Sequence, residues 1–424
     1  MAFDAKARAA TRCVDAASDT PANLNVSLFE GFAAAEVQWR SFERVADCTP
    51  FQTFDWLVTW QRRIGQHGGA IPAIALASFP NGDTAFLLPL CIDSKNAARR
   101  LCWLGQDVND YNAPLLARDF AQRVSPDSFR AIWQELRIRM QCQPRLRHDW
   151  IELEKMPQTI SGQVNPFFHL SHALNPSGAH FAQLSADWKQ FYHAKRSSAT
   201  RRRDRAKRKH MSQFGEVSFL TSADADDTRR TLETLMAQKG RLLAHRGIAD
   251  MFARPGWREF FLDIAANPAT RHLVHVSRIE VGADCAAANL GVVFGDTYYH
   301  VLASYADGAL AHYGPGALHL RELLAYAISR GLKQFDFTIG DEPYKREWSD
   351  THVNLADYTA VTTWRGWLPY CQSAVRRPLK RFIKQTPWAW RMASRFRSCF
   401  GPLLRRNPSQ ADAGGASFQS DLPP

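Results

Sequence analysis

Apolar and polar positions alternate with two different periods along the chain, and this pattern divides the sequence into two stretches of mixed helices and strands. In the first stretch, residues 24–160, the predicted elements are helices over 32–46, 54–64 and 125–140 and strands over 71–79, 84–92 and 149–156. The turn sequence PNGD joins the first two strands and predicts an antiparallel hairpin.

The second stretch, residues 186–370, contains more elements. It predicts a helix beginning near 186, helices over 226–246, 256–266 and 316–330, and strands over 216–220, 272–280, 285–294, 297–305 and 334–339. Short glycine-containing turns join the three strands between 272 and 305, so these strands pair antiparallel. The helix over 316–330 acts as a crossover and predicts that the last two strands are parallel. The sequence thus indicates an α/β domain with a mixed sheet.

The remaining segments suggest boundaries. Residues 161–185 are rich in Pro, Gly, Ser and Asn and predict a connector. The expected organisation is a flexible leader (1–23), an N-terminal domain (24–160), the connector (161–185), a C-terminal domain (186–370), basic amphipathic helices (371–406) and a disordered tail (407–424).

Composition narrows the class of protein. The 424 residues are 45% hydrophobic, which is enough for two or three packed domains. The chain contains no run of about 18 apolar residues, so the sequence predicts no membrane-spanning helix. The first residues lack the apolar segment of a secretory signal. The eight cysteines form no C-x-x-C pair, which disfavours a zinc site or a disulfide framework and favours a reducing cytoplasm. We therefore expect a cytoplasmic protein that holds no metal.

Positive charge is concentrated in two segments. Residues 195–210 contain nine Lys/Arg and one Asp, and residues 376–406 contain ten Lys/Arg and no acid. Since the whole chain carries only +12, the rest of it is net acidic. For the first segment three interpretations stay open: a solvated helix face, a contact for phosphates of a cofactor or anionic acceptor, or a nucleic-acid patch. The last is disfavoured because no aromatic residue is interleaved for base stacking.

The second basic segment predicts an amphipathic helix that begins near Pro387 and ends at Gly401. Aromatic and methionine side chains repeat every four residues beside arginines. This pattern is typical of an interfacial helix on anionic lipid, and equally of a terminal helix packed on the protein body. We expect peripheral membrane contact through 379–404 under the first interpretation.

A short glycine-containing loop precedes the predicted helix over 316–330. Gly314 and Gly316 allow positive φ and close backbone approach, and Pro315 sets a turn. Ala317 and Leu318 follow at the helix start, where free N–H groups and the helix dipole suit phosphate oxygens. The loop is also an ordinary way to begin a helix, so on these residues alone both interpretations stay open.

The sequence around this loop resembles a known family. Three antiparallel strands, a glycine loop, a helix and a parallel strand look like the GNAT N-acyltransferase domain. The stretch YGPGALHLRELL…GLKQFDFTIGDEPYKREW is more specifically similar to bacterial CelD/BcsL-like (BioF2-like) acetyltransferases, which show Tyr-Ser-Pro-Gly and later Asp-Phe-x-x-Gly-x-x-x-Tyr-Lys-x-x-Trp. The chain departs from this pattern at Gly314, where serine is usual. TPFQTFDWLVTW, GQDVNDYNAPL and NPF extend the resemblance over about 24–365.

The resemblance implies a fold and a co-substrate. The expected fold is a tandem of GNAT-like domains, each a mixed, mostly antiparallel sheet flanked by helices, of which the N-terminal one is degenerate. The C-terminal domain would bind acetyl-CoA or another acyl-CoA between the strands over 297–305 and 334–339. Its pyrophosphate would contact the loop residues Tyr313, Gly314, Pro315, Gly316, Ala317 and Leu318.

Several residues are candidates for the chemistry of acyl transfer. Tyr344 would protonate the departing thiolate, unless it only packs in a lid. Asp336 would act as a base or hold the acceptor amine, unless it pairs structurally with a nearby cation. His300 has a side-chain pKa suited to a base if it stays near neutrality, although a strand histidine is commonly structural. Lys345 and Trp348 are the acceptor-binding candidates, and a solvated lysine is the alternative for the first.

Two hypotheses follow. The first is an acyltransferase that moves an acetyl or acyl group from acyl-CoA to an amine or hydroxyl acceptor; the resemblance, through exopolysaccharide operons, implies a sugar or cell-envelope precursor. The second is an inactive GNAT-like protein that binds the inner membrane or nucleic acid through its basic segments. A hydrolase elbow G-x-S-x-G and a P-loop are both missing from the sequence.

Overall fold

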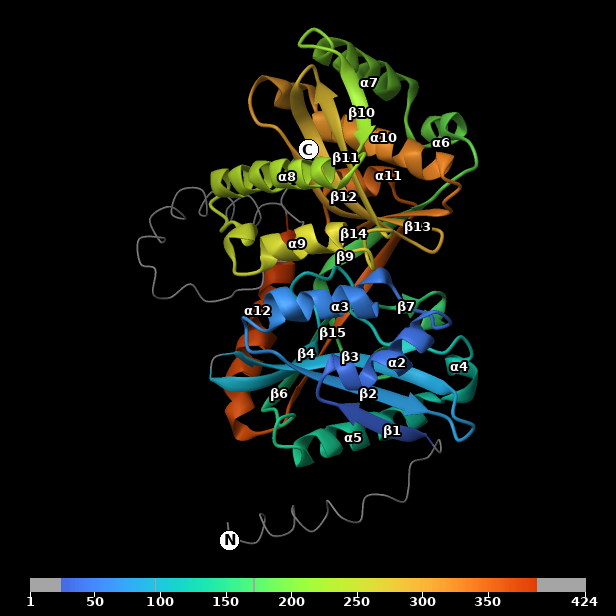
Figure 1. The fold of residues 1–424 in the computed structure, drawn as a ribbon, viewed down its shortest axis with the longest axis vertical. Helices are drawn as coiled ribbons and strands as arrows, with labels where there is room; N and C mark the ends of the chain where they lie inside the picture. The colour runs from blue at the N-terminus through green and yellow to red at the C-terminus, as the bar shows by residue number, and fades with distance from the viewer. Residues whose placement is uncertain (1–23, 96, 171, 387–424) are drawn as a thin grey trace. The chain divides into compact units, whose positions relative to one another are not determined.

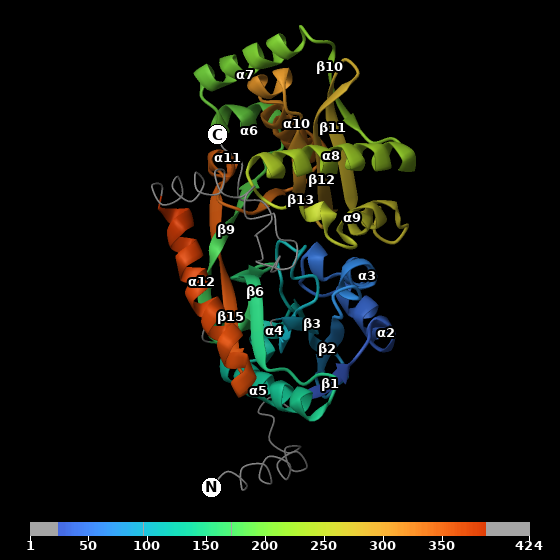
Figure 2. The same ribbon diagram turned by 90° about the vertical axis from the view of Figure 1, so that its left-hand side faces the viewer.

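The structure is a computed structural model, and it describes residues 24–386 except 96 and 171. The chain forms two compact units (Figures 1 and 2). The first comprises residues up to Asn175 together with Asn354–Pro378, and the second comprises Pro176–Val353 and the residues after Pro378. The predicted helix beginning near Pro387 lies outside the described residues. In the described part of the chain, every helix is too short or too polar to cross a bilayer.

The first unit is a mixed sheet with helices on it. Its strands are β1 (Asn25–Phe29), β2 (Ile71–Ser78), β3 (Thr84–Lys95), β4 (Ala98–Trp103), β5 (Leu115–Leu116), β6 (Trp150–Pro157) and most of β15 (Thr351–Val361), with a small ribbon of β7 (Thr159–Ile160) and β8 (Gln163–Val164). Its helices are α2 (Phe32–Glu43), α3 (Phe54–Trp60), α4 (Phe120–Arg123), α5 (Pro126–Cys142) and the first part of α12 (Trp367–Gln385). The strand order is β1-β2-β3-β4-β6-β15, and only the β4–β6 pair is parallel.

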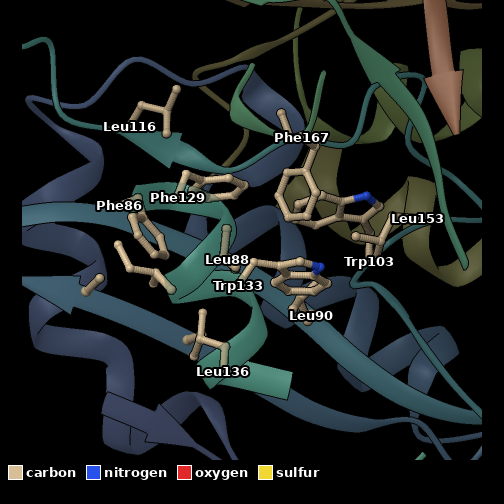
Figure 3. Packing of buried hydrophobic residues seen from close by; sticks show 14 of the residues in the cluster. Phe86, Leu88, Leu90, Trp103, Leu116, Phe129, Trp133, Leu136, Leu153 and Phe167 are labelled. Atoms are coloured by element: carbon tan, nitrogen blue, oxygen red, sulfur yellow. The ribbon is translucent and has the colours of Figure 1, made fainter. Parts of the chain in front are cut away.

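Aromatic side chains fill the core of the first unit (Figure 3). Phe167 packs edge-on against Trp103 and Trp133, with ring centroids 5.4 and 5.1 Å apart, and Phe129 lies 5.2 Å from it. Each such pair contributes about 0.5–1.5 kcal/mol beyond simple burial. The side chain of Asn165 accepts the Phe167 N–H and so holds this ring in place. Phe167 lies in the predicted connector, which is therefore not a plain linker.

The strands of the second unit are also arranged as a mixed sheet. Its strands are most of β9 (Ala173–Gln183), with β10 (Val217–Thr221), β11 (Val274–Val281), β12 (Asp284–Phe294), β13 (Thr297–Tyr305) and β14 (Gln334–Ile339). Its helices are α6 (Trp188–Lys195), α7 (Ser198–Met211), α8 (Ala225–His245), α9 (Trp257–Ala266), α10 (Pro315–Ser329) and α11 (Pro343–Trp348). The strand order is β9-β14-β13-β12-β11-β10, and only β13–β14 is parallel.

The predicted fold class is confirmed: both sheets are mixed, mostly antiparallel and flanked by helices. The 71–92 hairpin, the three antiparallel strands of the second unit and the parallel last pair are all present. The predicted connector is wrong in part, because β9 occupies much of it and pairs with β14. The sequence did not indicate this strand because Asn, Pro, Ser and Gly stand in its first half, where the buried positions begin.

Candidate functional site

The parallel strands β13 and β14 part from one another soon after they begin. They pair only at Thr297–Tyr299 against Gln334–Asp336, whereas β13 runs on to Tyr305. The parting lies at the carboxyl ends of both strands. The chain from β13 enters α10 at this same end of the sheet, because a crossover helix begins where the preceding strand finishes. The opening and the start of α10 are thus brought together by topology.

A strained residue marks the point of parting. Thr338 has φ of +61°, in the left-handed region that threonine rarely occupies, and it is fully buried. The carboxylate of Asp336 accepts its N–H at 2.7 Å, and its hydroxyl donates to the His300 carbonyl at 3.2 Å. Strain of this kind persists only where surrounding contacts hold it, and it gathers at functional sites. Asp336 therefore shapes the bulge in β14.

The glycine loop has the backbone conformation that its sequence predicts. Gly314 adopts φ +68° and ψ +57° and is the N-cap of α10, with Pro315 in the first turn. A Cβ on Gly316 would lie 3.4 Å from Cδ1 of Tyr305, so the backbone there lies close against the end of β13. The N–H groups of Ala317 and Leu318 both donate to the Gly314 carbonyl, at 3.1 and 3.2 Å. The sequence predicted that these N–H groups would be free, but both are already used in hydrogen bonds of the helix.

Helix α7, the first basic segment, packs against this loop. The ring of His210 stacks on Tyr313 with centroids 5.7 Å apart, and Met211 is buried in a cluster with Leu310 and Leu318. Two ion pairs join α7 to α10, Arg208 with Glu322 at 2.6 Å and Arg321 with Asp204 at 3.1 Å.

Docking of α7 carries a cation to the loop. Nζ of Lys207 lies 3.7 Å from the position that a Cβ on Gly314 would take. The start of α10 thus combines a helix dipole, a glycine backbone that no side chain covers, and a lysine ammonium. These three features together favour the binding of phosphate oxygens. Most side chains of α7 are exposed, so a solvated face and a contact for phosphates both stay open as interpretations of this segment.

The pKa of His300, the predicted base, differs from the near-neutral value expected of it. It is buried on β13, and this burial, reinforced by Lys345 and Lys239, lowers its pKa to about 3. Its imidazole is therefore neutral at pH 7, with a pKa far below the neutral range that favoured it as a base. Tyr344 is partly buried against the aromatic cluster that contains Trp348 and Phe337. Its role as an acid stays a prediction.

The two acceptor-binding candidates are buried. Lys345 is fully enclosed; its ammonium donates to the Ile339 carbonyl at 2.7 Å and pairs with Glu342 at 3.2 Å. Trp348 is 2% exposed and stacks on Phe191, with centroids 6.2 Å apart. Lys345 thus holds α11 against β14, and Trp348 packs α11 against α6; a role of either side chain in acceptor binding stays a prediction. Sequence reasoning missed their enclosure because the pattern of a motif does not show which of its members are enclosed.

A cluster that the sequence did not suggest lies next to the bulge. His180 is on β9 between the residues that pair with Asp336 and Ile339, and its ring lies 4.8 Å from that of His352. One ligand atom each of His180, Asp341 and His352 lie within 4.8 Å of one another. The residues are 172 positions apart along the chain, and only the sheet brings them together.

The environment of His180 keeps it neutral. Its side chain is 2% exposed, and burial, with nearby His352, Lys345 and Arg346, lowers its pKa to about 3. Nδ1 lies 3.4 Å from the Ser349 hydroxyl, while the buried Nε2 has no hydrogen-bond partner among the described residues. A neutral imidazole with a free nitrogen can accept a hydrogen bond from an amine or hydroxyl. Two histidines and a carboxylate also match the donor set of a divalent cation.

Gly178 makes room for this cluster. A Cβ at that position would lie 2.2 Å from Nε2 of His352, closer than any real contact. Only glycine therefore allows the imidazole to approach the β9 backbone here. Elsewhere in the second unit, a cavity of about 590 Å³ lies at the opposite end of α10, beside Tyr326 and Arg330. None of the predicted site residues lines it.

Comparison with known proteins agrees with this geometry. Residues 198–346 match the family model described as "Acetyltransferase (GNAT) domain", a range that holds α7, the glycine loop, the bulge and Tyr344. Over these residues the second unit is therefore similar to a GNAT acetyltransferase domain. None of the curated proteins matches the chain at a significant level.

Solved structures extend the likeness to most of the chain. A crystal structure of FemX is 8% identical, with a TM-score of 0.55, and the match covers 81% of this chain and 99% of that one. The C-terminal domain of a lysylphosphatidylglycerol synthetase from Agrobacterium fabrum, named as putative, is 9% identical with a TM-score of 0.47, covering 81% of this chain and 97% of that one. A tandem GNAT protein from the clavulanic acid pathway is 10% identical with a TM-score of 0.43, covering 80% and 98%. Only the FemX match is strong enough to bear on the fold, and it bears on nothing else.

Proposed function

We propose that this protein is an acyltransferase that moves an acetyl or longer acyl group from acyl-CoA to an amine or hydroxyl acceptor. The observation that carries the proposal is the parting of β13 from β14 beside the glycine start of α10, with Lys207 at the loop. Pantetheine is a narrow chain with amide groups, which suits the gap between two strands whose backbones have stopped pairing. The diphosphate would lie at Gly314 and Gly316.

The reaction consists of one bond exchange. The acceptor nitrogen or oxygen forms a bond to the thioester carbonyl carbon, the carbon–sulfur bond breaks, and the acceptor's proton ends on the coenzyme A thiolate. Tyr344 is our candidate for delivering that proton. Neutral His180 would accept a hydrogen bond from the attacking group through Nε2, which orients its lone pair toward the carbonyl.

The class of acceptor is a narrower proposal. The resemblance to CelD/BcsL-like proteins suggests a sugar or envelope precursor, and the amine or hydroxyl of an amino sugar fits a site of neutral imidazoles. Because Lys345 is enclosed and pairs with Glu342, we assign recognition of an anionic acceptor to the exposed cations of α7 as well.

A thiol-release screen tests the proposal. The full chain is supplied with acetyl-CoA and longer acyl-CoA donors against simple amines, amino sugars and hydroxyl sugars, and binding of each donor is measured by calorimetry. We expect micromolar binding of at least one donor and thiol release that depends on an acceptor. Tyr344→Phe should lower kcat and leave donor binding unchanged.

Three outcomes would reject parts of this proposal. If no acyl-CoA binds at micromolar concentration, the acyltransferase assignment is wrong. Donor binding without thiol release from any acceptor would favour the inactive binding protein instead. Loss of activity with a chelator, restored by a divalent cation, would make the cluster of His180, Asp341 and His352 a metal site and not a hydrogen-bond acceptor.

A further inference from the structure

Helix α12 is amphipathic with its polar side turned inward. Ser373 and Arg377 are both buried, and each donates to the carboxylate of Glu152 on β6, at 2.7 and 2.9 Å. Arg377 also lies 3.3 Å from Glu154. These bonds fix the rotation of the helix about its own axis, since turning it would leave a buried guanidinium and a buried carboxylate unpaired. Figure 2 shows α12 running beside β6 and β15.

The opposite side of the helix is apolar and exposed. Half of the twelve large apolar side chains recorded as exposed in the described residues lie here, and we call these six the α12 stripe: Trp364, Trp367, Leu368, Val375, Leu379 and Phe382. Trp364 lies in the turn just before α12, and within the helix the other five, with the exposed Cys371, are spaced so that they share one face. Trp364 is 82% exposed and Val375 is 67% exposed. A patch of this kind marks an interaction surface.

The charge around the stripe indicates what covers it. Between residues 358 and 386 the chain holds six Lys/Arg and no Asp or Glu. Arg365 is exposed, and Arg376, Lys380 and Arg381 are half-buried along the edges of the helix. An apolar face with tryptophans, edged by cations alone, is complementary to the headgroup region of an anionic bilayer. A protein partner or a second copy of the chain would need a matching acidic rim, and the basic edges would repel a second copy of themselves.

We propose that α12 binds the surface of a membrane containing anionic phospholipid, with the α12 stripe inserted at headgroup level and the flanking cations on lipid phosphates. The inward bonds to Glu152 hold the stripe outward before any lipid is present, so binding does not have to order the helix. This surface is separate from the proposed acyltransferase site, and neither proposal depends on the other.

Vesicle co-sedimentation of the full chain tests this proposal. Binding should be strong to phosphatidylcholine vesicles that contain phosphatidylglycerol, weak to pure phosphatidylcholine, and reduced by salt. Val375→Glu should weaken binding about tenfold, because one apolar side chain of the stripe is lost and a like charge meets the lipid. Gln134→Glu adds the same charge at an exposed position of another helix, α5, and should have a clearly smaller effect.

Three results would overturn the proposal: wild-type binding by Val375→Glu, equal loss in both variants, or no binding to anionic vesicles. Light scattering without lipid gives a fourth, since a dimer that Val375→Glu converts to a monomer would make the stripe an interface between copies. Both variants should keep the wild-type thermal midpoint and acyl-CoA binding, which shows that the variants are folded.

Discussion

The two units contain the same local arrangement with opposite outcomes. In each unit, two strands joined by a crossover connection pair in parallel and then separate after a few residues. β4 and β6 pair at two positions, and β13 and β14 pair at three. In each, the second strand then contains a buried non-glycine residue with positive φ, Lys155 at +59° and Thr338 at +61°. An aspartate accepts the N–H of both residues, Asp357 at 2.9 Å and Asp336 at 2.7 Å.

In the first unit the protein fills the resulting gap itself. The Lys155 ammonium donates to the carbonyls of Gln106 and Asn109, at 3.0 and 2.8 Å. The Asn112 N–H donates to the Lys155 carbonyl at 3.1 Å, so the loop after β4 replaces the missing strand pairing. Asn109 also accepts from the buried Trp56 indole at 2.8 Å.

In the second unit the short side chain of Thr338 takes the place that Lys155 has in the first unit. The chain after β13 passes to Gly314 and directly into α10. The comparison shows that the same backbone geometry, a parallel pair of strands that separates, can be filled by side chains in one unit and left open in the other. We infer that the first unit is structural and that acyl-CoA binding belongs to the second unit alone.

Lowering the pH should produce the largest difference in stability between the two units. In the second unit, burial lowers the pKa of His275 to about 4, of His180 and His300 to about 3, and of His319 well below its usual value. In the first unit, burial lowers the pKa of His148 to about 4. Unfolding lets these groups bind protons below their ordinary pKa of about 6.5, so their stabilisation is complete above pH 6.5 and is lost as pH falls toward 4.

The expected result is a selective loss of stability in the second unit, since each unit of pKa depression is worth about 1.4 kcal/mol. In the first unit Asp357 works the other way, because burial raises its pKa to about 6 and its protonation favours the folded state as pH falls. Hydrogen exchange, corrected for its intrinsic pH dependence, should show β12 losing protection before β3. Simultaneous loss in both strands would contradict the contrast.

Removal of the carboxylate of Glu152 should damage the first unit. This fully buried side chain accepts from Arg100 at 2.7 Å as well as from Ser373 and Arg377. Glu152→Ala takes away one carboxylate partner from each of two buried arginines, Arg100 and Arg377, and should cost about 3–5 kcal/mol in urea denaturation. Glu322→Ala, which breaks the exposed pair with Arg208 in the second unit, should cost below about 1 kcal/mol. Similar losses would show that burial does not govern these ion pairs.

A bulky residue at the loop should abolish donor binding. In Gly316→Trp the side chain would occupy the space beside Tyr305 where the diphosphate approaches the backbone, and acyl-CoA affinity should fall more than about 100-fold. Gly31→Trp is the matched control, because Gly31 precedes a helix of the first unit and a Cβ there meets nothing within 4 Å. Calorimetry measures both. Unchanged affinity in Gly316→Trp would move the donor site away from α10.

The smallest expected effect concerns the basic helix. Lys207→Ala removes the ammonium beside Gly314 and should weaken acyl-CoA binding about tenfold, with a smaller dependence on salt. Lys209→Ala, an equal loss of charge at another exposed position of α7, should change affinity less. If the two variants weaken binding equally, α7 acts through its overall charge and not through contact.

Local sequence predicted the elements whose signals are local. The PNGD hairpin, the antiparallel strands of the second unit, the helix that ends at Gly331 and the parallel last pair followed from turns and periodicity. It did not predict β9, whose partners lie over 150 residues away, nor the enclosure of Lys345 and Trp348. It also gave no sign of the cluster of His180, Asp341 and His352, since nothing near any one of them points to the others.

The sequence by itself determined the order of helices and strands, the mixed sheets and the place of the glycine loop, because hydrophobic period and turn residues act over a few positions. Tertiary structure alone decided what those parts do. It selected which parallel pair is filled and which stays open, placed Lys207 at the loop, made the histidines neutral and turned the apolar side of α12 outward. Each of these depends on burial and on contacts between residues far apart in the chain, and neither quantity is written in a local pattern.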